Sequence, residues 1–300
     1  MGGLKKVENK FGRLKIIIIF ALMKKYELTQ NTKIVNDITL YQIKALINIP
    51  KLNINIGDLG GWIENERNLS HEGDAWVYGN AMVYGDAMVY DNARVSGNAR
   101  VFGNARVFGN AKIFGNAMVY GNARVYDNAR VYDDARVYDN AMVYGNARVY
   151  DDAKIFGNAR VYGNARVYGN AKIFGNARVY GNAMVYGDAM VCGNARVSGD
   201  AMVCGNAWVY GDAMVDGDAM VCGNAMIYGN AIISKTSDYM TISSLGETNR
   251  TITITFSNKK ISAGCFHNSL NEFKAAVDNK YNGEGNYYPV IKLIEELFGN

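Results

Sequence analysis

Proline and histidine are scarce in this chain, and both are absent from its central part. Of 300 residues, the prolines are Pro50 and Pro289, and the histidines are His71 and His267. Between residues 73 and 234, no proline therefore interrupts the hydrogen bonding of a β-sheet. The same stretch has no histidine to act as a general base, which excludes a histidine-dependent catalytic site built from those residues alone.

The sequence also lacks an apolar run long enough to span a membrane. The run Ile16–Met23 is far shorter than the roughly 20 residues that a spanning helix needs. Lysine-rich residues precede it, as in a secretory signal peptide, but no small-x-small cleavage site follows. We expect Met23 to be the natural start and residues 1–22 to be a non-native or disordered leader, with a weak membrane-associating stretch as the alternative.

No part of the chain has a large excess of one charge. Residues 73–234 carry 14 Lys or Arg and 14 Asp, residues 235–300 balance at seven each, and the net charge of +4 lies in residues 1–72. This distribution excludes a strongly basic nucleic-acid-binding domain in the middle of the chain, and equally an acidic mimic of DNA. Four cysteines without a regular pairing pattern suggest a reducing compartment, so we expect a cytoplasmic protein.

What the sequence does contain is one hexapeptide, Gly-Asn-Ala-x-Val-Tyr, repeated 27 times from Gly73 to Ser234 without insertion or deletion. Position 3 is always Ala and position 5 is always Val or Ile, so both point inward on a strand, while position 4 points outward. Positions 1 and 2 are Gly, Asn or Asp, which tolerate the left-handed backbone of a corner. A fixed short period predicts a solenoid. Three hexads per turn give a three-sided parallel β-helix of nine coils, about 43 Å long.

The hexads resemble those of left-handed β-helix proteins, whose best-known members are trimeric acyltransferases. A closer resemblance is to bacterial and phage hexapeptide proteins of unassigned role that are labelled transferases. It rests on the hexads, on Leu40–Leu46, Gly57–Glu64 and Asn68–Ser70, and on Gly264–Phe266 with Leu270–Lys274. The resemblance implies a single-stranded left-handed parallel β-helix. It supplies no catalytic residues.

The flanking segments are expected to cap the two ends of the β-helix, because an uncapped end would expose a sheet edge. We predict an N-terminal β cap over residues 23–72, with one or two strands in Ile38–Asn55 and a tight turn at Gly57–Gly61. Residues 235–300 are predicted to form a small α+β domain. Its strand Ile252–Phe256 pairs with Lys260–Cys265, a helix opened by a capping box runs from Ser269 to about Lys280, and a second helix runs from about Tyr287 to Phe298.

Few residues are candidates for chemistry. His71 and His267 flank the repeat, and each is interpreted as a surface or capping residue rather than a catalyst. Four aspartates cluster in sequence, but they occupy corner positions and are assigned a backbone role: Asp127, Asp133, Asp134 and Asp139. We predict no catalytic residue, no cofactor and no metal site.

The outward positions are more distinctive, because residues 18 apart stack on one face. Aromatic residues at position 6 predict three stacked rows, beginning at Tyr90, Tyr132 and Tyr120. Lys and Arg at position 4 predict parallel basic rows. Near the C-terminal end the outward positions become apolar, and we interpret them as a contact surface for self-association, a partner or the C-terminal domain: Met184, Met190, Met202, Trp208, Met214, Met220 and Met226. Cys204 and Cys222 also stack, but we expect free thiols because parallel side chains hold their Cβ atoms slightly too far apart.

These observations favour a non-catalytic β-helix scaffold that binds a protein partner or itself. An acyltransferase-like enzyme is the alternative that the resemblance implies, and a binder of polyanions such as nucleic acid or glycan is the third. The array's balanced charge argues against nucleic acid as a partner, and the absence of a spanning segment argues against a membrane.

Overall fold

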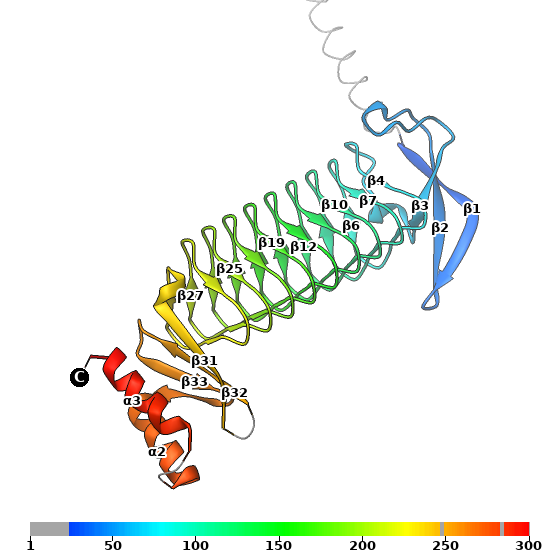
Figure 1. The fold of residues 1–300 in the computed structure, drawn as a ribbon. Coiled ribbons are helices and arrows are strands. Elements are labelled where there is room, and N and C mark those ends of the chain that lie inside the picture. The colour runs from blue at the N-terminus through cyan, green and yellow to red at the C-terminus, as the bar shows by residue number, and fades with distance from the viewer. Residues whose placement is uncertain (1–23, 247–248, 283–284, 300) are drawn as a thin grey trace, which may run out of the picture.

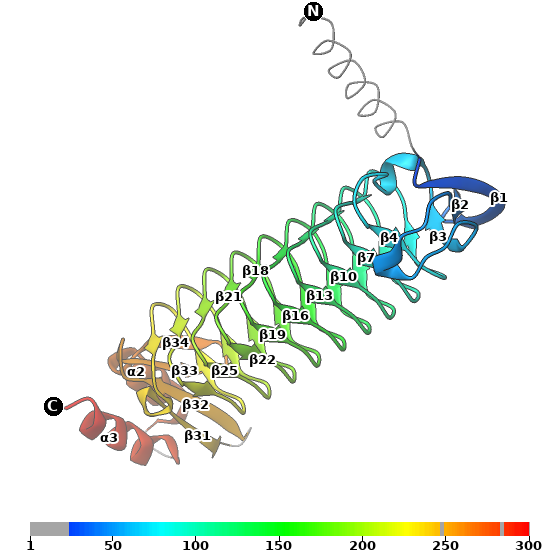
Figure 2. The same cartoon turned by 90° about the horizontal axis from the view of Figure 1, so that it is seen from above.

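The computed structural model describes residues 24–246, 249–282 and 285–299. It is a long three-sided prism with a β-hairpin at the N-terminal end and a small α+β unit at the C-terminal end (Figures 1 and 2). The expected leader, residues 1–22, lies outside the described residues. Within the described residues, no helix is long and apolar enough to cross a membrane.

Each hexad contributes one two-residue strand at positions 4 and 5, and strands 18 residues apart pair in parallel. The first face consists of β4 (Trp76–Val77), β7 (Arg94–Val95), β10 (Lys112–Ile113), β13 (Arg130–Val131), β16 (Arg148–Val149), β19 (Arg166–Val167), β22 (Met184–Val185), β25 (Met202–Val203) and β28 (Met220–Val221). The second face consists of β5 (Met82–Val83), β8 (Arg100–Val101), β11 (Met118–Val119), β14 (Arg136–Val137), β17 (Lys154–Ile155), β20 (Lys172–Ile173), β23 (Met190–Val191), β26 (Trp208–Val209) and β29 (Met226–Ile227). The third face consists of β6 (Met88–Val89), β9 (Arg106–Val107), β12 (Arg124–Val125), β15 (Met142–Val143), β18 (Arg160–Val161), β21 (Arg178–Val179), β24 (Arg196–Val197), β27 (Met214–Val215) and β30 (Ile232–Ile233). Nine regular coils are therefore confirmed.

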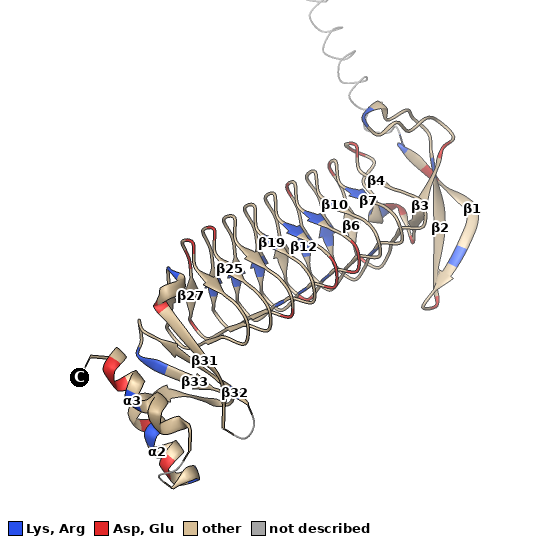
Figure 3. Ribbon diagram, viewed as in Figure 1, with Lys and Arg blue, Asp and Glu red and all other residues tan. Residues whose placement is uncertain are grey.

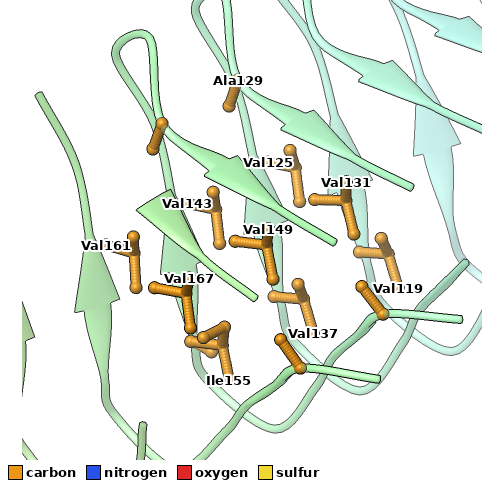
Figure 4. Close-up of a cluster of buried hydrophobic side chains, with 14 of the residues drawn as sticks. Val119, Val125, Ala129, Val131, Val137, Val143, Val149, Ile155, Val161 and Val167 are labelled. Atoms are coloured by element: carbon orange, nitrogen blue, oxygen red, sulfur yellow. The ribbon is translucent and has the colours of Figure 1, made fainter. Parts of the chain in front are cut away.

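The core of the prism is the stack of inward side chains at positions 3 and 5. Every Ala at position 3 and every Val or Ile at position 5 is fully buried, from Ala75 to Ile233. Figure 4 shows this packing in the central coils, where Val131, Val137 and Val143 come from three different faces and meet inside the prism. The prediction of which positions face inward is confirmed.

The corners need a left-handed backbone and, at position 1, almost no side chain. Gly97 has a φ of 70°, and a Cβ added there would lie 2.8 Å from the carbonyl oxygen of Gly115 in the next coil. Aspartate is the one other residue found at this position. Asp127 has a φ of 57°, and its carboxylate accepts a hydrogen bond from the backbone N–H of Gly145 at 3.1 Å. That bond explains how a side chain is accommodated at a strained corner.

The N-terminal cap adds an irregular turn to the nine coils. β3 (Leu59–Ile63) pairs in parallel with β5, and Leu69 forms a parallel bridge with Val89. Gly60 and Gly61 therefore lie in a strand, so the predicted tight turn over Gly57–Gly61 is wrong beyond its first residues. They are glycines because a Cβ at Gly61 would lie 2.6 Å from the Val77 side chain.

A β-hairpin closes this end and covers the beginning of the second face. It comprises β1 (Tyr26–Val35), which the sequence did not predict, and β2 (Ile38–Ala45), which pairs with β3. Leu40 of the hairpin packs on Met82 and Tyr84, so these two outward residues are buried. Short 3₁₀ helices at Pro50–Leu52 (η1) and Glu66–Asn68 (η2) complete the cap.

At the N-terminal end of the solenoid, carbonyl oxygens of the first coils have no preceding regular coil to bond to. Two buried polar side chains, those of Lys25 and Asn68, donate hydrogen bonds to them instead. The Lys25 ammonium donates to the carbonyl oxygens of Gly73 and Ala75 at 3.3 and 2.8 Å. The Asn68 amide donates to those of Gly85 and Ala87, both at 2.9 Å. These donors replace the backbone N–H groups that a preceding coil would supply.

The C-terminal unit is a four-stranded antiparallel sheet with two helices. Its strands are β31 (Tyr239–Leu245), β32 (Arg250–Thr255), β33 (Lys260–Ala263) and β34 (Phe266–Ser269), preceded by η3 (Thr236–Asp238). Its helices are α2 (Leu270–Tyr281) and α3 (Tyr287–Leu297), and Ser269 and Glu272 form the predicted capping box. The predicted strand pair and both helices are confirmed, whereas β31 and β34 were not predicted.

The last coil has backbone N–H groups with no following coil to bond to. Three hydroxyl oxygens of the C-terminal segment, one on each face, accept hydrogen bonds from these groups. The backbone N–H groups of Met220, Met226 and Ile232 donate to the side-chain oxygens of Thr236, Thr253 and Ser257 at 3.1, 2.9 and 2.8 Å. In every earlier coil the same N–H donates to an alanine carbonyl, as Met202 does to Ala219. The hydroxyls thus stand where a tenth regular coil would place its carbonyls.

One expectation about the cysteines is wrong. Cys204 and Cys222 are joined by a disulfide, and their Cα atoms are 4.6 Å apart. The expectation of free thiols accepted the Cα separation but assumed that parallel side chains hold the Cβ atoms slightly too far apart. The structure shows that the two side chains can turn toward each other and bond. Cys192 and Cys265 are free. The pairing also removes the argument from cysteine pattern for a reducing compartment.

Alkylation of the folded protein without reductant tests this pairing. We expect the exposed Cys265 and the half-buried Cys192 to be labelled, and Cys204 and Cys222 to be recovered as one linked peptide pair by mass spectrometry. The two free cysteines serve as the internal control for labelling. Full alkylation at all four positions would restore the original expectation of free thiols.

Candidate functional site

The outer surface is built from rows of identical side chains, one row for each outward position of the hexad. Position 6 gives three rows of stacked aromatic rings, with neighbouring centroids 4.7–5.1 Å apart and planes within 6° of parallel. The predicted rows beginning at Tyr90, Tyr132 and Tyr120 are confirmed. Two extend further than expected, one back to Phe114 and the other back to Tyr84. Each ring inside a row is therefore covered on both faces by its neighbours, and the rings at the row ends are covered on one face.

Position 2 gives rows of asparagine amides that are hydrogen-bonded to one another, which was not predicted from the sequence. On the first face, each amide nitrogen donates to the amide oxygen one coil further on, from Asn92 through Asn182 to Asp200, at 2.8–3.2 Å. A similar row on the third face runs from Asn104 to Asp212. On the second face, Asp134 interrupts the row because a carboxylate has no N–H to donate onward.

Position 4 gives the predicted basic rows, and Figure 3 shows their segments recurring along successive coils. The first face has an uninterrupted row of Arg94, Lys112, Arg130, Arg148 and Arg166. On the third face Met142 interrupts the row between Arg124 and Arg160. Burial, and then the charges of Arg94 and Arg130, hold the pKa of Lys112 below its ordinary value. The three faces are therefore not equivalent.

The candidate contact surface is an apolar band around the last coils; its members are Met184, Met190, Met202, Trp208, Met214, Met220 and Met226. The structure distributes the band over all three faces. Met184, Met202 and Met220 stack on the first face, Met190, Trp208 and Met226 stack on the second, and Met214 lies beside Ile232 on the third. The most exposed members are Trp208 at 42% and Met220 at 40%, and the neighbouring Ile232 is 48% exposed.

His71 lies beneath the N-terminal hairpin, stacked on Tyr26 with ring centroids 4.3 Å apart. Its Nδ1 accepts a hydrogen bond from the backbone N–H of Lys25 at 3.1 Å. Its Nε2 is buried without a hydrogen-bond partner among the described residues and lies 3.7 Å from Glu66 Oε2. Burial is the main cause that lowers the pKa of His71, so the ring is neutral near pH 7. With its lone pair already occupied by a backbone amide, His71 is not free to act as a general base.

His267 lies at the other end, where β34 meets the solenoid. The Tyr210 hydroxyl is 2.6 Å from its Nε2 and 2.9 Å from its Nδ1, and its ring is tilted against that of Tyr228 at 4.8 Å. The row that begins at Tyr84 ends at Phe174, because the next coil has Cys192 at this position. Tyr210 and Tyr228 form a separate pair beyond it, and His267 extends this pair onto the C-terminal unit. Burial is the cause that lowers the pKa of His267. His71 is thus held within the N-terminal cap, whereas His267 joins the C-terminal unit to the solenoid, so the two histidines lie at opposite ends.

The aspartates that cluster in sequence do not cluster in space. Asp127, Asp133 and Asp139 occupy corners that lead into the first, second and third faces, respectively. Asp127 and Asp139 accept backbone N–H bonds from the next coil, and Asp134 accepts from Asn116. Among the described residues, no group of three His, Cys, Asp or Glu side chains is arranged to hold a metal ion.

Comparison with known proteins agrees with the repeat architecture. A family model described as "YdcK Beta solenoid repeat" matches the array repeatedly, over residues 75–101, 111–151, 153–211 and 219–235. No curated protein matches the chain. Among solved structures, a UDP-N-acetylglucosamine acyltransferase from Arabidopsis is similar, with 11% identity and a TM-score of 0.24, covering 61% of this chain and 69% of that one. The chain is thus a β-solenoid repeat protein.

Proposed function

We propose that this protein is a non-catalytic scaffold, whose β-solenoid holds a capped N-terminal end and an α+β C-terminal unit a fixed distance apart. The observation that supports this most strongly is that the corner aspartates, the asparagine rows and both histidines make structural contacts. Corner aspartates bond to backbone N–H groups, and asparagines bond to one another. His71 accepts from Lys25, and His267 contacts Tyr210.

The apolar band is the proposed contact surface, and a second copy of the chain is its simplest occupant. Elsewhere in the array the outward position is mostly Arg or Lys, whose charge keeps the surface solvated. In the last coils it becomes Met or Trp on neighbouring strands of one face, such as Met190, Trp208 and Met226. Flexible methionines around an exposed tryptophan are typical of protein contact surfaces.

Sedimentation equilibrium of two matched variants tests this surface. Trp208→Arg lies in the band on β26, and Met118→Arg lies outside it on β11 of the same face. We expect the wild type to self-associate, Trp208→Arg to weaken association at least tenfold, and Met118→Arg to leave it unchanged. Circular dichroism should show an intact fold for both variants.

Two results would contradict the proposal. A wild-type protein that stays monomeric at high micromolar concentration would exclude a second copy as the occupant. Equal weakening by Trp208→Arg and Met118→Arg would show that added charge, rather than the band, controls association.

A further inference from the structure

The uninterrupted basic row of the first face has no ion-pair partner among the described residues. Parallel pairing places Arg94, Lys112, Arg130, Arg148 and Arg166 one above another, at the strand spacing of about 4.8 Å. In the part of the chain that the structure describes, none of these five side chains forms an ion pair. Like charges directly opposite each other destabilise a sheet. The fold also accepts Met or Trp at the same position, so it does not require this row.

A row of hydrogen-bond donors runs parallel to these charges on the same face. The amide row from Asn92 to Asn182 uses one N–H of each amide to reach the next coil, and every amide nitrogen carries two. Hollows lie between the two rows. One is lined by Asn92, Arg94, Asn110 and Lys112, with the Lys51–Asp74 ion pair beside them, and another by Asn164, Arg166, Asn182, Met184 and Asp200. Guanidinium groups and amides together suit an anion that accepts several hydrogen bonds, as a carboxylate does.

The aromatic row of this face limits which polyanion fits. Single-stranded nucleic acid is normally held by stacking its bases on exposed aromatic faces. Here the rings from Phe114 to Tyr186 stack on one another with centroids 4.7–4.9 Å apart. A base inserted between two rings would need about 3.5 Å on each side. The ring faces between neighbours are therefore unavailable along the row, and a ligand without bases is favoured.

We propose that the first face binds an extended acidic polysaccharide, which lies along the prism axis with its carboxylates against the row from Arg94 to Arg166 and its hydroxyls beside the Asn92–Asn182 amides. A sugar unit of an extended chain is about as long as one strand spacing, so a chain that runs along the prism axis brings carboxylates to several coils of the row. The five cations span four spacings, about 19 Å. This surface adjoins the apolar band, because Arg166 pairs with Met184 on the same face, but the inference does not depend on the proposed self-association.

The test measures binding of a decamer of galacturonic acid by calorimetry in 20 mM salt. One variant combines Arg130→Gln, Arg148→Gln and Arg166→Gln on the first face. The matched control combines Arg136→Gln, Lys154→Gln and Lys172→Gln on the second face, where Asp134 breaks the amide row. Both variants lose three positive charges. We expect the first-face variant to weaken binding at least tenfold and the control less than threefold.

Three further measurements sharpen the result. Wild-type affinity should fall as salt rises, and this dependence should be shallower in the first-face variant, because ion contacts are screened. The methyl-esterified decamer should not bind. Arg148→Glu alone should also weaken binding, which keeps the test informative if the triple variant does not fold.

The proposal fails if the acidic decamer does not bind, or if the two triple variants lose affinity equally. It also fails if a 12-nucleotide single-stranded DNA binds more tightly than the decamer and loses that affinity in the first-face variant. That last result would assign the face to nucleic acid.

Discussion

Replacing Val137 with aspartate is expected to lower the free energy of unfolding by about 4 kcal/mol or more, because it would bury an unpaired carboxylate in a dry core. Val137 is fully buried in β14, and all inward neighbours in the prism are Ala, Val or Ile. Ala135→Leu should also destabilise strongly, since the fully buried Ala135 has no space for three more carbons.

Tyr138→Ser, one residue further on, is the matched control. Tyr138 points outward and stacks between Tyr120 and Phe156 at 4.9 and 5.0 Å. Its loss should cost about 1 kcal/mol, the scale of a cross-strand pair, and Ser96 and Ser198 already occupy this position in other coils. Urea denaturation of the three variants provides the measurement. Equal losses for Val137→Asp and Tyr138→Ser would mean that the inward and outward positions had been reversed.

The second large effect is expected at the N-terminal cap. Asn68→Ala should destabilise the protein by about 3 kcal/mol, because the carbonyls of Gly85 and Ala87 would lose the amide donor that the fully buried Asn68 supplies. The fully buried Asn68 also accepts the Asn65 backbone N–H at 2.9 Å. Removing one side chain therefore leaves three backbone groups unsatisfied.

Asn146→Ala is the control for this prediction, because Asn146 makes comparable bonds on the exposed amide row. It accepts from Asn128 and donates to Asn164 at 3.2 and 3.1 Å. Water can replace these partners at the surface, so Asn146→Ala should lower the free energy of unfolding by less than about 1 kcal/mol. Hydrogen exchange should show Asn68→Ala exposing the first coils before the central ones. If both variants exchange alike, the cap does not protect that end.

The sequence predicted the solenoid well because every coil repeats the same local rule. Ala135 and Val137 face inward for the same reason as Ala75 and Val77, so one correct assignment of the hexad fixes all 27 strands. The corners followed equally directly from Gly and Asn. The aromatic rows needed only the further assumption of three hexads per turn.

The caps could not be predicted in the same way, because their contacts join residues that are far apart and do not repeat. Lys25 reaches Ala75, and Thr253 reaches Met226. Nothing near Asn68 in sequence indicates that its amide will meet Gly85 and Ala87. The roles of His71 and His267 depend on the same long-range contacts. The bonded amide rows could have been found, since Asn recurs at the same position every 18 residues.

Bonds between neighbouring coils lie roughly along the prism axis, while the covalent chain winds around that axis (Figure 2). A force that pulls the two ends apart therefore loads one coil-to-coil contact at a time. Each coil that detaches frees 18 residues, about 60 Å of extended chain. Once a cap has unfolded, the molecule should lengthen in equal steps at nearly constant force. It would therefore limit the force transmitted between two partners bound at its opposite ends.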